Sequence, residues 1–198
     1  MRRRAFLIGA AALPLAGCAG TSVWAPDEAL ARARFPNPGP TSLAVITVRN
    51  EWNRSGEHTA LLIAASERAM FDPFGGWSDP EVPERDDVLF GLSDAALERY
   101  LAYQANEGFF YVRQEKAVPP LVAETALARA RAHGPVGVAQ CTRAVADILD
   151  GLPGFEGLGR PWTPDTMARR VARLAGVETS ERHGPGFGPG LDGAAAPA

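Results

Sequence analysis

Cys141 is the residue in this sequence best suited to covalent chemistry. The chain has only two cysteines, and the other one, Cys18, lies in an apolar N-terminal segment. Apolar spacing around Cys141 predicts a helix that starts within residues 136–140 and ends at Gly151, with the thiol in its first turn. The partial positive charge of a helix N-terminus stabilises a thiolate and lowers the pKa of a cysteine. The position predicts a nucleophilic sulfur; the alternative is a small cysteine that packs in the core.

A thiolate nucleophile needs a base within hydrogen-bond reach, and that base needs a group to orient it. The sequence has three histidines. His133 ends a predicted helix, where its charge suits the helix dipole. His183 belongs to a Gly- and Pro-rich C-terminal segment that we expect to be disordered. His58, which begins a predicted strand directly after a polar loop, is therefore the expected base; the alternative is a histidine satisfied within the core.

Asp72 is the residue expected to hold the ring of His58. Residues 58–72 have the pattern of a β-hairpin with a short connection, so the end of its second strand lies near the start of its first. Because strand side chains alternate between faces, a register change of one residue would turn Asp72 away from the ring. Glu57 and Asn53 remain alternatives for the third residue, and Asp72 also suits a turn.

These residues are positioned by a domain of the predicted α+β class. Strand patterns cluster early in the chain and helical patterns late, which favours a small antiparallel sheet covered by helices over a wound parallel sheet. The predicted strands are 43–48, 58–63, 68–72, 88–90 and 109–112, and the predicted helices follow Ser93, begin at Pro119–Pro120, carry Cys141, and follow Thr163.

The order of these motifs resembles the circularly permuted papain-like fold of the permuted NlpC-type peptidases and lecithin retinol acyltransferase-like enzymes. The similar segments are Gly56–Ile63, Met70–Gly75, Gln140–Leu149 and Arg160–Pro164, so the resemblance spans about residues 41–175. The sequence departs from the pattern in having Asp72 where relatives often carry His, Glu or Asn. No separate Gln or Asn is evident for an oxyanion hole, although the backbone N–H of Cys141 could be one donor.

The resemblance implies a cysteine hydrolase of amide bonds. Cys141 would be the nucleophile, His58 the base and Asp72 the residue that fixes the imidazole tautomer. For an envelope protein the family implies peptidoglycan stem peptides as the substrate, or else lipid or lipoprotein acyl groups. The alternative is a non-catalytic module with the same fold that binds a cell-wall or protein partner. One cysteine and scattered histidines show no metal-ligand spacing, and no cofactor is expected.

The N-terminus has the pattern of a bacterial lipoprotein signal. Arg2–Arg4 precede an uncharged apolar stretch from residue 5 to 16, which is typical of a secretory signal and too short to span a bilayer. Leu15–Cys18 resembles the lipobox, in which the cysteine is lipidated and becomes the new N-terminus. Residues 3–7 also resemble a twin-arginine export signal. Ala19, in place of an Asp, favours the outer membrane, so we expect a lipid-anchored protein that faces the periplasm.

The expected organisation is a signal peptide at 1–17, a lipidated tether at 18–40, the papain-like domain at 41–178 and a disordered tail at 179–198. The 181 residues left after removal of the signal peptide suit one domain with tails. The expected partners are the membrane, through Cys18, and peptidoglycan. The net charge of −3 argues against a nucleic-acid partner.

Replacing Cys18 with Ser should abolish lipidation and release a soluble or unprocessed protein, because the hydroxyl cannot replace the lipidated sulfur. Detergent phase separation measures this directly. A Cys18→Ser protein that still partitions into the detergent phase would contradict the lipoprotein prediction.

Overall fold

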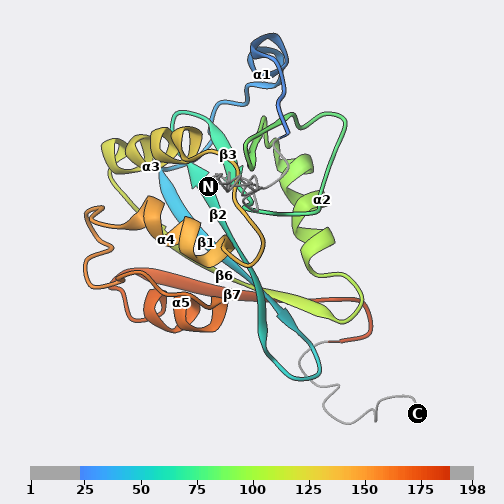
Figure 1. The fold of residues 1–198 in the computed structure, drawn as a ribbon, viewed down its shortest axis with the longest axis vertical. Helices are drawn as coiled ribbons and strands as arrows, with labels where there is room; N and C mark the ends of the chain where they lie inside the picture. The colour runs from blue at the N-terminus through green and yellow to red at the C-terminus, as the bar shows by residue number, and fades with distance from the viewer. Residues whose placement is uncertain (1–22, 188–198) are drawn as a thin grey trace, which may run out of the picture.

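The computed structural model describes residues 23–187 and has one open antiparallel sheet of seven strands, in the order β4-β5-β3-β2-β1-β6-β7 (Figure 1). The predicted α+β class is confirmed, although the sheet is larger than expected. The strands are β1 Ser42–Asn50, β2 Gly56–Ala64, β3 Arg68–Phe71, β4 Glu84–Arg85, β5 Val88–Phe90, β6 Phe109–Ala117 and β7 Val177–His183. The helices are α1 Asp27–Ala33, α2 Asp94–Gln104, α3 Pro120–His133, α4 Cys141–Leu149 and α5 Pro164–Val171.

Helices cover both faces of the sheet. Helices α3, α4 and α5 pack on one face and α2 on the other, as Figure 1 shows. Side chains of β2 alternate between the two layers: Leu61 and Ile63 join the larger core under α3 to α5, whereas Ala60 and Leu62 join the smaller core under α2. A strand buried on both faces needs a nearly continuous apolar run, and β2 has one from residue 60 to 64.

The predicted starts of two helices are confirmed by their caps. Ser93 Oγ accepts a hydrogen bond from the backbone N–H of Ala96 at 3.2 Å, which caps α2. Thr163 Oγ1 likewise accepts from Thr166 N at 3.3 Å, with Pro164 at the first position of α5. Such caps satisfy N–H groups that have no acceptor within the helix. Within residues 23–187, no helix combines the length and apolar character needed to cross a membrane.

The prediction that the chain is disordered from residue 179 is wrong for its first part. Residues 177–183 form β7, which pairs along β6 from Lys116 to Phe110. His183 Nδ1 donates to the buried carboxylate of Glu51 at 2.8 Å, and its ring stacks on Phe110 with centroids 4.8 Å apart. These contacts with β6 and Glu51, which are distant in the sequence, order a segment whose Gly-rich continuation predicts disorder. Residues 188–198, the rest of the predicted tail, lie outside the described residues.

The segment predicted as a tether is packed on the domain over its described part, residues 23–40. It contains α1, forms a bridge between Trp24 and Arg85, and reaches β3 through the bond from Arg68 N to the Phe35 carbonyl at 3.1 Å. Leu30 also packs against the larger core. The proline-rich composition of the segment did not indicate these contacts, because Arg68 and Arg85, which bind it, lie more than 30 residues away from their partners in the sequence. Cys18 and the predicted signal peptide lie outside the described residues.

Truncation after Glu178 should destabilise the domain, because it removes most of β7 and the His183 ring that donates a hydrogen bond to buried Glu51. We expect a loss of about 2 kcal/mol in unfolding free energy. That corresponds to a decrease of about 4–8 °C in Tm, measured by thermal unfolding. Truncation after Phe187 is the matched control and should change Tm by less than about 2 °C. Equal Tm values for the two truncated proteins would show that β7 contributes nothing.

Candidate active site

His58 and Asp72 form a direct pair across the β2–β3 hairpin. Asp72 Oδ1 lies 2.6 Å from His58 Nε2, which donates because a carboxylate only accepts. The register explains the contact: β2 and β3 pair Leu61 with Phe71, so Asp72 falls opposite Ala60 and on the same face as His58. The pairing geometry predicted from the hairpin is confirmed.

The carboxylate of Asp72 is almost completely buried, with 3% of its side chain exposed. Its Oδ1 also accepts a hydrogen bond from the hydroxyl of Tyr100 at 3.0 Å. Tyr100 is fully buried on α2, beneath the sheet face that carries His58. The sequence does not indicate this role, because the spacing of apolar residues in α2 favours burial of Tyr100 but does not show which group its hydroxyl contacts.

The loop after Asp72 leaves no room for a side chain at Gly75. A Cβ atom there would lie 2.0 Å from Asp72 Oδ2, well inside contact distance. The backbone N–H of Gly75 donates to the Asp72 carbonyl at 2.9 Å, which folds the loop back over the carboxylate. A glycine is therefore required so that the loop can cover Asp72 without displacing it.

Cys141 is the first residue of α4 and is partly exposed. The adjacent residue, Thr142, is buried and its hydroxyl lies 2.9 Å from the hydroxyl of Thr59 on β2. Because Thr59 follows His58 and Thr142 follows Cys141, this bond fixes the start of α4 beside the start of β2. The cap residue Gln140 makes no side-chain bond to the helix, so the N-terminal dipole remains available to the sulfur.

The thiol of Cys141 and the ring of His58 interact and shift each other's pKa. Burial opposes the charge of His58, but the hydrogen bonds and charges of Asp72 and Cys141 outweigh it and raise the pKa to about 10. Burial also opposes a thiolate at Cys141. The bond to His58, its charge, the Thr59 N–H and the Thr142 hydroxyl together lower the pKa of the thiol below its ordinary value. Each partner thus favours the charged form of the other, the thiolate at Cys141 and the imidazolium at His58.

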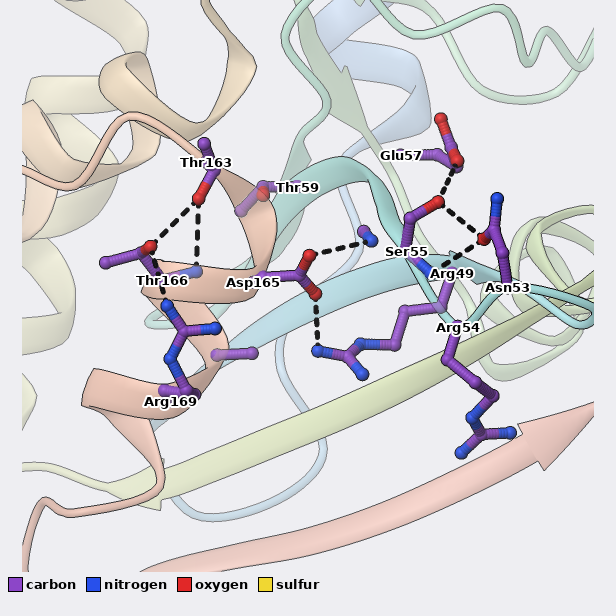
Figure 2. Close-up of polar contacts among 12 residues, drawn as sticks. Arg49, Asn53, Arg54, Ser55, Glu57, Thr59, Thr163, Asp165, Thr166 and Arg169 are labelled. Atoms are coloured by element: carbon purple, nitrogen blue, oxygen red, sulfur yellow. Dashed lines mark hydrogen bonds and ion pairs between the residues drawn. The ribbon is translucent and has the colours of Figure 1, made fainter.

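The start of β2 is clamped by α5 (Figure 2). Asp165 Oδ1 accepts from Arg49 Nη2 at 2.6 Å, and Asp165 Oδ2 accepts from the backbone N–H of Gly56 at 3.2 Å. A Cβ at Gly56 would lie 2.7 Å from Pro164 Cβ, so the helix and the strand meet at backbone distance. Gly56 is two residues before His58. The clamp therefore sets the position from which His58 projects.

The other candidate residues lie elsewhere. Glu57 and Asn53 both bind Ser55, at 2.5 Å and 2.7 Å between side-chain oxygens, rather than His58 (Figure 2). His133 is at the end of α3, as predicted. His183 is ordered, contrary to the reason given for excluding it, but it lies on β7, three strands from β2, and binds Glu51.

A pocket of about 340 Å³ lies at the loop that follows Asp72, lined partly by Val23, Phe74, Trp77, Glu84 and Asp87. Burial raises the pKa of Glu84 to about 7, and the charges of Asp87 and Asp72 act in the same direction. Burial also raises the pKa of Asp87, although hydrogen bonds from the backbone of Val136 and Phe74 oppose the shift. The pocket is thus lined by two carboxyl groups whose raised pKa values favour their neutral forms, and Gly75, which also lines it, lies against Asp72.

No metal site accompanies the pair in the part of the chain that the structure describes, since no three His, Cys, Asp or Glu residues there converge as ligands would. Comparisons with protein-family models, curated proteins and solved structures found no match to the chain. The chemistry of the site therefore has to be argued from its own geometry.

Replacing Gly75 with Ala should disrupt the His58–Asp72 pair, because the new methyl group displaces the carboxylate. We expect a loss of about 1–3 kcal/mol in unfolding free energy from overpacking. Alkylation of Cys141 at pH 6 should also slow several-fold. Gly76→Ala is the matched control: its Cβ would meet only the Tyr103 hydroxyl at 3.2 Å, so both measurements should stay near those of the parent. Equal effects of the two substitutions would contradict this role of Gly75.

Proposed function

We propose that this protein is an envelope-anchored cysteine hydrolase that cleaves amide bonds by acyl transfer. The observation that carries the proposal is that His58 is bonded to buried Asp72 at 2.6 Å, while the Thr59–Thr142 bond places Cys141 beside His58. The raised pKa of His58 and the lowered pKa of Cys141 accord with a bond between the thiol and the ring. Nucleophile, base and orienting residue are the three parts that covalent catalysis by cysteine requires. A small core cysteine would need neither a histidine partner nor a buried carboxylate behind it.

In the first step the Cys141 thiolate attacks the amide carbonyl carbon and forms a C–S bond. The carbonyl oxygen takes up the negative charge, and the backbone N–H of Cys141 at the start of α4 is the donor we propose for it. The tetrahedral intermediate collapses by breaking the C–N bond, and the imidazolium of His58 gives its proton to the departing amine. Since Nε2 is bonded to Asp72, Nδ1 is the ring nitrogen left for this transfer.

In the second step neutral His58 removes a proton from water, whose oxygen attacks the thioester carbon. The C–S bond breaks, which regenerates the Cys141 thiolate and the His58 imidazolium and releases the carboxylic acid. Throughout, Asp72 holds the ring in one orientation and stabilises its positive charge. Tyr100 in turn donates a hydrogen bond to Asp72, so a buried chain of hydrogen bonds supports the His58 ring.

The proposed fold is the circularly permuted papain-like one. It is supported by a histidine at the start of a strand, an acidic residue at the end of the next strand and a later helix that opens with the cysteine. Helix α4 contacts β2 through the Thr59–Thr142 bond, as a cysteine helix packed on its sheet would. The order of these parts along the chain is histidine before cysteine.

The proposed location is the bacterial envelope, where the lipid on Cys18 anchors the protein, and the proposed substrates are peptidoglycan stem peptides. The carboxyl groups of Glu84 and Asp87 in the pocket near Asp72 support a substrate with a positively charged amino group, which would pair with them and favour their ionised forms. Peptides with free amino groups meet this requirement, whereas phosphorylated substrates do not.

The direct test is the pH dependence of Cys141 alkylation by iodoacetamide. A thiolate paired with His58 should react rapidly down to about pH 6, well below the free thiol pKa of about 8.5. His58→Ala should remove the pairing and slow the reaction at pH 6 at least about tenfold. Asp72→Asn should have a smaller effect, because it orients the ring without contributing charge directly to the sulfur.

His133→Ala is the matched control, because that histidine lies at the end of α3, and it should leave the profile unchanged. An acylating probe directed at thiols should likewise label the parent and lose labelling in His58→Ala. A Cys141 that stays inert until the protein is unfolded would contradict hydrolysis and favour the binding module.

A further inference from the structure

The N-terminal segment lies alongside β4, the edge strand of the sheet, and bridges to it between Trp24 and Arg85. Ala25 N donates to the Glu84 carbonyl at 2.9 Å, and Asp86 N donates to the Val23 carbonyl at 3.0 Å. Arg85 fixes the segment from the side: its guanidinium lies 4.3 Å from the ring centroid of Trp24 and forms an ion pair with Asp27 at 2.7 Å. The segment is therefore a structured part of the domain from residue 23 onward.

Large apolar side chains are exposed at this edge. Trp24 is 64% exposed, and Val23 and Phe74, which line the same pocket, are each about half exposed. On the side of Trp24, the edge adjoins a pocket of about 530 Å³ that Arg34 also lines. We call Val23, Trp24, Arg34 and Phe74 the anchor-side edge. In Figure 1 the adjoining helix α1 stands at the end of the molecule opposite the β1–β2 turn.

The length of chain before Val23 limits how far this edge can lie from the anchor. Five residue steps separate Cys18 from Val23, and an extended chain covers at most about 3.6 Å per residue. A lipid on Cys18 would thus hold Val23 within about 18 Å of the bilayer surface. Because residues 23–36 are bound to the domain, they add no slack to this limit.

We propose that the anchor-side edge rests on the phospholipid surface that holds the Cys18 lipid. Trp24 enters the headgroup region, where an amphipathic indole is most stable. Val23 and Phe74 add apolar contact, and the exposed Arg34, which forms no ion pair with any of residues 23–187, meets lipid phosphates. This inference rests on the proposed lipidation of Cys18 but not on the proposed hydrolysis.

The orientation has a consequence for the candidate active site. Val23 lines the same pocket as Glu84 and Asp87, so the pocket opens next to the membrane-contacting edge. A protein on a long flexible tether would sample every orientation relative to the bilayer, whereas in this orientation the pocket stays close to the bilayer surface. The substrate portion that enters the pocket is then the one nearest the membrane.

The test is quenching of tryptophan fluorescence in the lipidated full chain, reconstituted in phospholipid vesicles with bromine on the acyl chains near the headgroups. The chain has four tryptophans; Trp77 is buried, while Trp24, Trp52 and Trp162 are 64%, 63% and 66% exposed. We expect quenching of the parent and its loss in Trp24→Phe. Trp52→Phe and Trp162→Phe are matched controls of equal exposure and should retain the quenching.

Quenching that persists in Trp24→Phe, or that is lost in either control instead, would overturn the proposed orientation. Vesicle flotation of the same samples separates this outcome from failure of the anchor. A protein that floats with vesicles but shows no Trp24 quenching keeps its lipid and refutes the edge contact. A protein that does not float refutes the lipidation, and neither result depends on the reactivity of Cys141.

Discussion

The buried carboxylate of Asp72 is the group on which the arrangement of the site depends. A carboxylate with 3% exposure is unfavourable unless hydrogen bonds compensate its lost hydration, and here His58 and Tyr100 both donate to Oδ1. The first bond fixes the imidazole, and the second ties the carboxylate to α2. Gly75 closes the loop over the remaining oxygen. Buried groups, rather than a mobile surface loop, thus hold the base His58 in one orientation.

Two faces of one sheet cooperate to bring the sulfur to that base. Asp72 and Tyr100 lie on the α2 side of the sheet, whereas α4 packs on the opposite side. Strand β3 ends at Phe71, so it does not run alongside the start of β2, where His58 lies. The Thr59–Thr142 bond and the Asp165 clamp on Gly56 hold the start of β2 from the α4 and α5 side. His58 has no partner on β3, because the pairing of β2 with β3 stops at Leu61 and Phe71.

The local parts of this arrangement could be predicted from the sequence. A tight hairpin relates Asp72 to His58 by register alone, and the caps Ser93 and Thr163 fix helix starts from neighbouring residues. The long-range parts could not be predicted. Strand β7 is largely exposed and has no apolar alternation, so only its pairing with β6 and the Glu51–His183 bond reveal it. The sequence pattern indicates only that Tyr100 is buried, because the hydrogen-bond partner of its hydroxyl is determined by the tertiary structure.

We propose that Asp72 and the Cys141 thiolate hold His58 as an imidazolium. The most direct measurement is the titration of the His58 ring by nitrogen chemical shifts in NMR. We expect that His58 remains protonated well above its ordinary pKa of 6.5, toward about 10, and that Asp72→Asn lowers this pKa. A ring that titrates at or below 6.5 in the folded parent, as burial alone would produce, would contradict it.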